Sequence, residues 1–238
     1  MSVVRIASVY ASLLGTYGDG GNVAALVHRA LLHDIHVEVI DVTPGLVLPR
    51  QADLYVLGGG EDTAQVAAAN ALRTDGGLTD AANRGAVVFA ICAGYQLLGE
   101  HFPDATGKPA PGVGILDITT NRLPKRAVGE LAAIPNEVNR ELGLTQILTG
   151  YENHAGATHR GSGVEALATV RAGTGNGDGT EGSVSGRTIG TYLHGPCLAR
   201  NPELADRLIS WVVGRDLPTI TEPEVEALRQ ERLKVVLG

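Results

Sequence analysis

Hydrophobic positions in the first hundred residues form short continuous runs that alternate with segments of helical periodicity. The runs VVRIASVY, VEVIDV, DLYVLG and AVVFAI occupy residues 3–10, 37–42, 53–58 and 86–91. Helical spacing predicts helices over residues 22–32, 62–72, 77–83 and 93–100. Strands that are apolar on both faces and separated by helices are typical of a covered parallel sheet. The pattern therefore predicts an α/β fold, with a mainly parallel central sheet, helices on both faces and a ligand site at the carboxyl ends of the strands.

The second half of the chain has a different pattern. Its apolar segments are GILDITT, VGELAAI, ILTGYEN, VEALATV and TIGTYLH, at residues 114–120, 128–134, 147–153, 164–170 and 188–194. Turn residues separate them without intervening helices, so we expect a partly antiparallel annex to the sheet. The glycine-rich segment 172–187 is interpreted as a flexible hairpin loop. Helices are predicted over 202–213 and 222–236, and residues 1–238 are expected to form a single domain.

Charge and cysteine content narrow the class of protein. The net charge is −7 and no basic cluster occurs, which argues against nucleic acid as a partner. No segment approaches the ~20 apolar residues that span a bilayer. The two cysteines, Cys92 and Cys197, lack the spacing of a metal site and favour a reducing compartment. We therefore expect a cytoplasmic protein with no metal, no cofactor and no direct membrane insertion.

Cys92 stands where the run AVVFAI ends and the next helix begins. A side chain at such a junction projects from the sheet edge toward the positive end of the helix dipole, which favours a thiolate nucleophile. Ala93 and Gly94 supply the small neighbours that a nucleophile elbow requires. A buried cysteine that acts as a small hydrophobe is an equally good interpretation of Cys92 alone.

Two further features favour the nucleophile. The glycines 58–60 follow a predicted strand and precede a helix, so their N–H groups are placed to stabilise an oxyanion. His194 ends the predicted strand 188–194, at the expected site edge, and a thiol nucleophile needs such a base. Glu152, Asn153 and His154 could support the site from behind or simply end a strand. Packing and backbone hydrogen bonding are the favoured interpretation, with His154 a weaker rival to His194.

Six stretches together resemble the class I, triad-type glutamine amidotransferases, in particular their cobyric acid synthase-like branch and its GatD-type glutaminase subunits. They are YGDGGN (17–22), LGGGEDTAQ (57–65), AICAGYQLLG (90–99), GILDITTNR (114–122), GYENHAG (150–156) and TYLHGP (191–196). The resemblance covers almost the whole chain and implies the class I amidotransferase fold.

The resemblance also implies residue roles. Cys92 would attack the side-chain amide of L-glutamine and form a thioester, with His194 as the base. Gly60 and the N–H of Ala93 would hold the oxyanion.

Three more residues would bind the substrate glutamine. The resemblance assigns this role to Gln96, Gly59 and Arg122. A guanidinium such as that of Arg122 suits an α-carboxylate.

One departure from the family pattern concerns His194. Many class I members have a glutamate two residues after this histidine, whereas here Gly195 and Pro196 follow. The triad is therefore predicted to be incomplete within the chain, and the GatD-type proteins share this gap. The acidic residue is then expected to come from a partner subunit.

The resemblance further implies a partner and a pathway. It predicts a heterodimer with a MurT-like, ATP-dependent ligase subunit that uses the released ammonia to amidate D-isoglutamate of lipid II in peptidoglycan synthesis. Lipid II would be reached only through that partner. The alternatives are the glutaminase component of a cobyrinic or cobyric acid amidase, and a non-catalytic regulatory module with the same fold.

Two other signals are rejected. YGDGGN and Asp41 resemble a dinucleotide-binding fingerprint, but Val23 stands where the third glycine belongs. We interpret this stretch as a loop leading to an Asn22 helix cap. The histidines at 28, 33 and 36 lack a ligand pattern, and a solvated helix face accounts for them.

Overall fold

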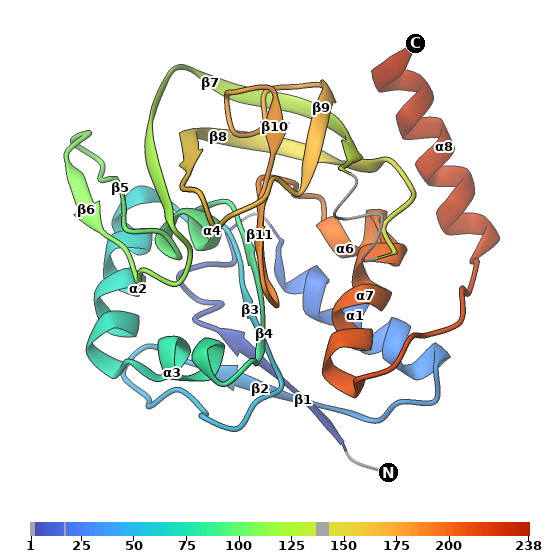
Figure 1. The fold of residues 1–238 in the computed structure, drawn as a ribbon, viewed down its shortest axis with the longest axis horizontal. Coiled ribbons are helices and arrows are strands. Elements are labelled where there is room, and N and C mark those ends of the chain that lie inside the picture. Colours follow the sequence, from blue (N-terminus) through green and yellow to red (C-terminus); the bar gives the residue numbers. More distant parts are fainter. Residues whose placement is uncertain (1–2, 17, 137–142) are drawn as a thin grey trace.

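A mainly parallel six-stranded sheet forms the base of the molecule in the computed structural model, which describes residues 3–16, 18–136 and 143–238 (Figure 1). The strand order is β11-β12-β4-β3-β1-β2, and only the pair β11–β12 is antiparallel. The strands are β1 (Val4–Val9), β2 (Val37–Val42), β3 (Leu54–Leu57), β4 (Val87–Ile91), β11 (Ser183–Ser185) and β12 (Thr188–Thr191). Every residue of β3, β4 and β12 is buried, as expected for strands covered on both faces.

Helices cover both faces of this sheet, which confirms the predicted fold class. Figure 1 shows α2 (Asp62–Asp75) and α3 (Gly77–Asn83) on one side, and α1 (Gly20–Leu32) and α7 (Pro202–Val213) on the other. The short helices α4 (Ala93–Leu97) and α6 (Cys197–Arg200) lie toward the second sheet. The α4 helix is shorter than the 93–100 predicted from periodicity.

The annex is a second sheet of mixed direction. Its strands follow the order β10-β9-β7-β5-β6, and β8 pairs with β7. They are β5 (His101–Pro103), β6 (Pro109–Pro111), β7 (Ile118–Pro135), β8 (Leu148–Arg160), β9 (Ala168–Ala172) and β10 (Thr180–Glu181). All pairs except β5–β7 are antiparallel, so the predicted partly antiparallel annex is confirmed.

The largest difference from the predicted elements is β7. The sequence predicts two strands with a break at residues 121–127, but β7 runs through this segment over 18 residues. Its pairing with β8 shifts register between Arg122 and Ala127, and this irregularity accommodates Pro124. The glycine-rich segment 172–187 likewise contains two short strands, β10 and β11.

Helix α8 (Pro223–Leu237) matches the predicted C-terminal helix and lies at the edge of the annex (Figure 1). Its buried Arg229 donates hydrogen bonds to the carbonyls of Arg200 and Ile147, which fastens the helix to the body of the molecule. Within the described ranges, no helix has both the length and the apolar character needed to cross a bilayer.

Candidate active site

The chain turns sharply at Cys92, between β4 and α4. Cys92 has φ 52° and ψ −106°, a strained conformation for a residue with a side chain. A Cβ on Gly94 would lie 2.8 Å from the carbonyl oxygen of Gly58, so only glycine allows this approach. The N–H of Gly94 donates to that same carbonyl at 3.1 Å. This geometry is that of a nucleophile elbow, and it projects the thiol at the carboxyl end of β4.

His194 reaches the elbow from the chain that follows β12. The strand ends at Thr191, three residues before the predicted end, and His194 pairs instead with Tyr151 of β8. Its N–H donates to the Tyr151 carbonyl at 2.9 Å, and its carbonyl accepts the Tyr151 N–H at 3.0 Å. The GYENHAG and TYLHGP stretches thus meet in space, and this contact fixes the backbone of His194.

The expectation that His194 lacks an acidic partner within the chain is wrong. Its Nδ1 lies 3.3 Å from each carboxylate oxygen of Asp19, which is 2% exposed. Burial opposes the charged imidazole, but hydrogen bonds and charge from Asp19 and Cys92 raise the pKa of His194 to about 10. An imidazolium that faces Cys92 is therefore the favoured form at neutral pH.

The sequence does not identify Asp19 as the acidic partner of His194, because Asp19 precedes α1 and lies far from His194 along the chain. It occupies the N-cap position of α1, which begins at Gly20, so the predicted Asn22 cap is wrong. Asn22 lies in the first turn, where its side chain donates to the Asp19 carbonyl and accepts the N–H of Leu198. The predicted stretch 17–22 also includes Tyr17, which is outside the described residues.

The glycine loop after β3 packs directly on the chain before α1. A Cβ on Gly58 would lie 2.0 Å from the Leu14 carbonyl oxygen, and one on Gly60 would lie 2.5 Å from that of Leu13. The N–H of Gly59 donates to Asp19 Oδ2 at 2.7 Å. The loop is therefore held against Asp19 at the same time as it approaches the elbow.

A pocket opens beside Cys92, between the parallel sheet and the annex. Five of the predicted site residues line it, namely Cys92, Ala93, Gly60, Gln96 and Arg122. The annex contributes the opposite wall, which includes Asn153, His154 and Gly156. His194 reaches this region through its contact with Cys92, and Gly59 reaches it through its hydrogen bond to Asp19.

Gln96 is fixed at the base of the pocket. Its Oε1 accepts a hydrogen bond from Gln65 Nε2 at 3.0 Å, and its Nε2 donates to the Tyr192 hydroxyl at 3.3 Å. The Tyr192 ring stacks on His154 with centroids 3.7 Å apart. Gln65 was not predicted as a site residue, although it closes the LGGGEDTAQ stretch.

Arg122 lies on β7 at the mouth of the pocket, not in a loop. Its side chain is 49% exposed, forms an ion pair with Asp62 at 3.5 Å and donates to the Asp104 carbonyl at 3.2 Å. The exposed guanidinium therefore supplies positive charge at the entrance to the pocket.

Glu152 and His154 form a separate buried pair. Glu152 accepts the N–H groups of Thr174 and Gly175 at 2.8 and 2.9 Å, and its carboxylate lies 3.4 Å from His154. Burial works to raise the pKa of Glu152, but hydrogen bonds from His154 and these N–H groups lower it. The pair holds the loop after β9 against β8.

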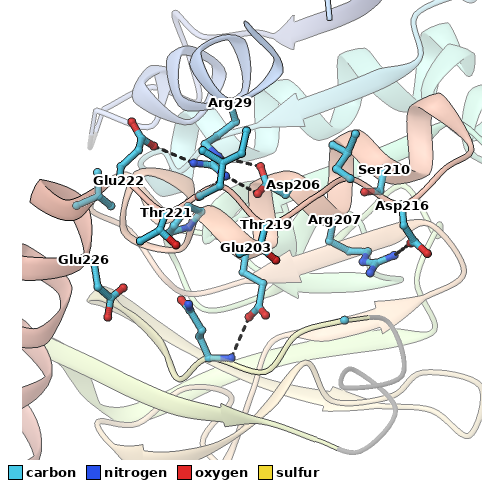
Figure 2. A pocket seen from close by; sticks show the side chains of 16 residues that line it. Arg29, Glu203, Asp206, Arg207, Ser210, Asp216, Thr219, Thr221, Glu222 and Glu226 are labelled. Atoms are coloured by element: carbon cyan, nitrogen blue, oxygen red, sulfur yellow. Dashed lines mark hydrogen bonds and ion pairs between the residues drawn. The ribbon is translucent and has the colours of Figure 1, made fainter. Parts of the chain in front are cut away.

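A second pocket lies among α1, α7 and α8 (Figure 2). Several of its charged side chains form ion pairs with one another: Asp206 and Glu222 bind Arg29, and Arg207 binds Asp216. His33 also contacts Asp206 at 3.3 Å, and His28 contacts Glu222. These ion pairs join the helices, and no cluster with the composition of a metal site occurs among the residues that the structure describes.

Known proteins of similar sequence include two GatD subunits of lipid II isoglutaminyl synthase. The Staphylococcus aureus protein is 31% identical over 94% of this chain and 90% of its own length. The Streptococcus pneumoniae protein is 34% identical over 87% of this chain and 79% of its own length. A cobyric acid synthase from Brucella canis is 37% identical over 67% of this chain, which spans only 32% of that synthase.

Solved structures share the fold at low sequence identity. A glutamine amidotransferase from Thermotoga maritima superposes with a TM-score of 0.56 at 16% identity, covering 100% of this chain and 90% of that one. The glutaminase domain of Trypanosoma brucei CTPS, with bound acivicin, gives a TM-score of 0.55 at 13% identity over 91% of this chain and 96% of that domain. The CobB/CobQ-like glutamine amidotransferase domain model matches residues 5–202. The chain therefore belongs to the CobB/CobQ-like family of glutamine amidotransferase domains.

Proposed function

We propose that this chain is a glutaminase subunit that hydrolyses L-glutamine through a thioester on Cys92 and passes the ammonia to a partner. The observation that carries this proposal is the thiol of Cys92, on a strained backbone turn beside the imidazole of His194, in a pocket lined by Gln96 and Arg122. Family membership supports the same reaction.

In the proposed reaction, His194 holds the proton of the Cys92 thiol. The thiolate attacks the carboxamide carbon of glutamine, and the N–H groups of Gly60 and Ala93 stabilise the oxyanion. His194 returns the proton to the amide nitrogen, the C–N bond breaks and ammonia leaves. A water molecule, deprotonated by His194, then hydrolyses the thioester to glutamate and restores the thiol.

Substrate binding is assigned to Arg122, Gln96 and Gly59. The Arg122 guanidinium suits the α-carboxylate of glutamine. Gln96 lies beside Cys92 in the pocket lining, where the carboxamide must sit. The Gly59 N–H is already donated to Asp19, so a substrate contact at Gly59 would use its carbonyl oxygen.

The partner in this proposal is a MurT-like, ATP-dependent ligase subunit in a heterodimer. Two relatives carry the name of the GatD subunit of lipid II isoglutaminyl synthase, over most of this chain. The ammonia acceptor would then be D-isoglutamate of lipid II in the cytoplasm, reached through the partner.

A cobyrinic or cobyric acid amidase is the second candidate. The sequence identity to a cobyric acid synthase supports this candidate. It is the weaker choice because this chain spans only 32% of the length of that synthase. A non-catalytic module is the third, and it would require that the Cys92 thiol be unreactive.

Labelling and co-purification separate these candidates. Acivicin should modify Cys92, as mapped by mass spectrometry, and excess glutamine should protect it. Failure to label Cys92 would favour the non-catalytic module. Co-purification from the native cell should then yield a Mur-ligase-like ATPase, whereas a corrinoid amidase would support the second candidate.

A further inference from the structure

Asp19 contacts two parts of the proposed active site at once. Its carboxylate oxygens lie 3.3 Å from His194 Nδ1, and Oδ2 also accepts the Gly59 N–H at 2.7 Å. Gly59 is adjacent to Gly60, which lines the pocket beside Cys92. One carboxylate therefore joins the proposed base to the loop of the proposed oxyanion donor.

We propose that Asp19 is the positioning residue of this site. It orients His194 and fixes the position of the Gly58–Gly60 loop relative to that histidine. This inference rests on the proposed glutaminase function and deepens it. It places the third member of a Cys-His-Asp triad in this chain, so a partner subunit need not supply the acid.

The surroundings of Asp19 hold its carboxylate in one place. The side chain is 1% exposed, and its backbone carbonyl accepts a hydrogen bond from the Asn22 side chain. A Cβ on Gly58 would lie 2.8 Å from the Asp19 Cβ, so the glycine loop packs closely against it. A buried carboxylate is costly unless it is paired, and here the pairing groups are His194 and the Gly59 N–H.

The contact also determines which nitrogen of His194 does the chemistry. When Nδ1–H donates to Asp19, Nε2 is the nitrogen that exchanges a proton with the Cys92 thiol. The groups that act on the charge of His194 are Asp19, from the turn before α1, and Cys92, from the elbow. Loss of the Asp19 charge should destabilise the protonated form of His194. The Cys92 thiolate, which faces this positive charge, should then be destabilised as well.

The test compares Asp19→Asn with Asp206→Asn in the full chain. The amide of Asp19→Asn can accept the Gly59 N–H only by turning its NH₂ toward His194, which favours the wrong imidazole tautomer. Asp206 makes a His33 contact of the same 3.3 Å length among α1, α7 and α8 and does not line the Cys92 pocket, so it is a matched control.

Two readouts distinguish orientation from folding. In Asp19→Asn, kcat for glutamine hydrolysis should fall by about 10³-fold or more, with KM within about threefold of the wild type. The rate of Cys92 alkylation by iodoacetamide should fall at pH 7, and its pH profile should move to higher pH. Cys197 is fully buried, with a pKa raised by burial, so alkylation reports on Cys92. Asp206→Asn should lower thermal stability but leave the profile in place.

The proposal is overturned if Asp19→Asn keeps the wild-type alkylation profile, or if Asp206→Asn shifts the profile equally. If the wild type does not hydrolyse glutamine with any partner but Asp19→Asn still shifts the profile, the proposed function fails and the positioning of His194 by Asp19 stands.

Discussion

The two walls of the Cys92 pocket come from different kinds of sheet. The parallel sheet supplies Cys92 at the end of β4 and the Gly58–Gly60 loop after β3. The annex supplies Arg122 and Gly156, from the interiors of the paired strands β7 and β8. The first wall is fixed by where strands end, and the second by the register between two long strands.

This difference separates reactive groups from recognition groups. Parallel strands all place their carboxyl ends at one edge of the sheet. A nucleophile and an oxyanion loop that each follow such a strand therefore lie close together. The antiparallel pair β7–β8 presents side chains along its length, which suits contacts to the remote end of a substrate. Changes in the first wall should therefore affect kcat, and changes in the second should affect KM.

The largest effect is expected at Cys92. Cys92→Ala removes the nucleophile and should lower glutamine hydrolysis by about 10⁴-fold or more, measured as glutamate release. Cys197→Ala is the matched control, because Cys197 is fully buried in α6, where it does not line the pocket. If Cys92→Ala keeps activity within tenfold of the wild type, the Cys92 thiol is not the nucleophile.

Arg122→Ala tests the annex wall. Loss of a charge-assisted hydrogen bond of about 1.5–3 kcal/mol should raise KM for glutamine by roughly 10- to 100-fold, with kcat within a few-fold. Steady-state kinetics measure both parameters. Lys125→Ala removes an exposed cation of the same strand that does not line the pocket and should leave KM unchanged. A fall in kcat alone would assign Arg122 to the reactive wall instead.

Gly156→Ala should perturb the contact between the walls. A Cβ at this position would lie 2.3 Å from Gln96 Nε2 and 2.5 Å from the Tyr192 hydroxyl. Overpacking of this kind costs about 1–3 kcal/mol, or roughly 2–4 °C in Tm per kcal/mol for a chain of this size. The displaced Gln96 should also raise KM. Gly163→Ala, where a Cβ meets nothing within 4 Å, should change neither quantity.

The first wall could be predicted from the sequence to a greater extent than the second. Continuous apolar runs predicted β4 and the junction at Cys92, because both faces of a central strand must be buried. Asp19 could not be identified in this way, since its contact with His194 joins residues 175 positions apart. The continuity of β7 through Pro124 does not follow from the sequence, because it depends on the long-range pairing with β8 on both sides of residues 123–126.

The last expected effect lies at the seam between the sheets, and it changes the pH dependence of stability and not the reaction. Glu181 of β10 accepts hydrogen bonds from the hydroxyl of Thr191, the last residue of β12 in the parallel sheet, and from the N–H of Tyr192, the next residue. Burial outweighs these hydrogen bonds and raises the pKa of Glu181 to about 7. The folded protein thus binds this proton more tightly than the unfolded chain, so its contribution to stability is complete below about pH 4.5 and is lost as pH rises through about 7.

Glu181→Gln should remove this pH dependence, since the amide resembles the neutral carboxyl. Above pH 7 the variant should gain up to about 3 kcal/mol of unfolding free energy relative to the wild type, and the difference should shrink toward pH 4.5. Urea unfolding at pH 5, 6, 7 and 8 measures the effect. Glu165→Gln, at an exposed position, is the control. A difference that stays constant across this pH range would mean that Glu181 is charged at the seam, and that its carboxylate binds the two sheets as an anion.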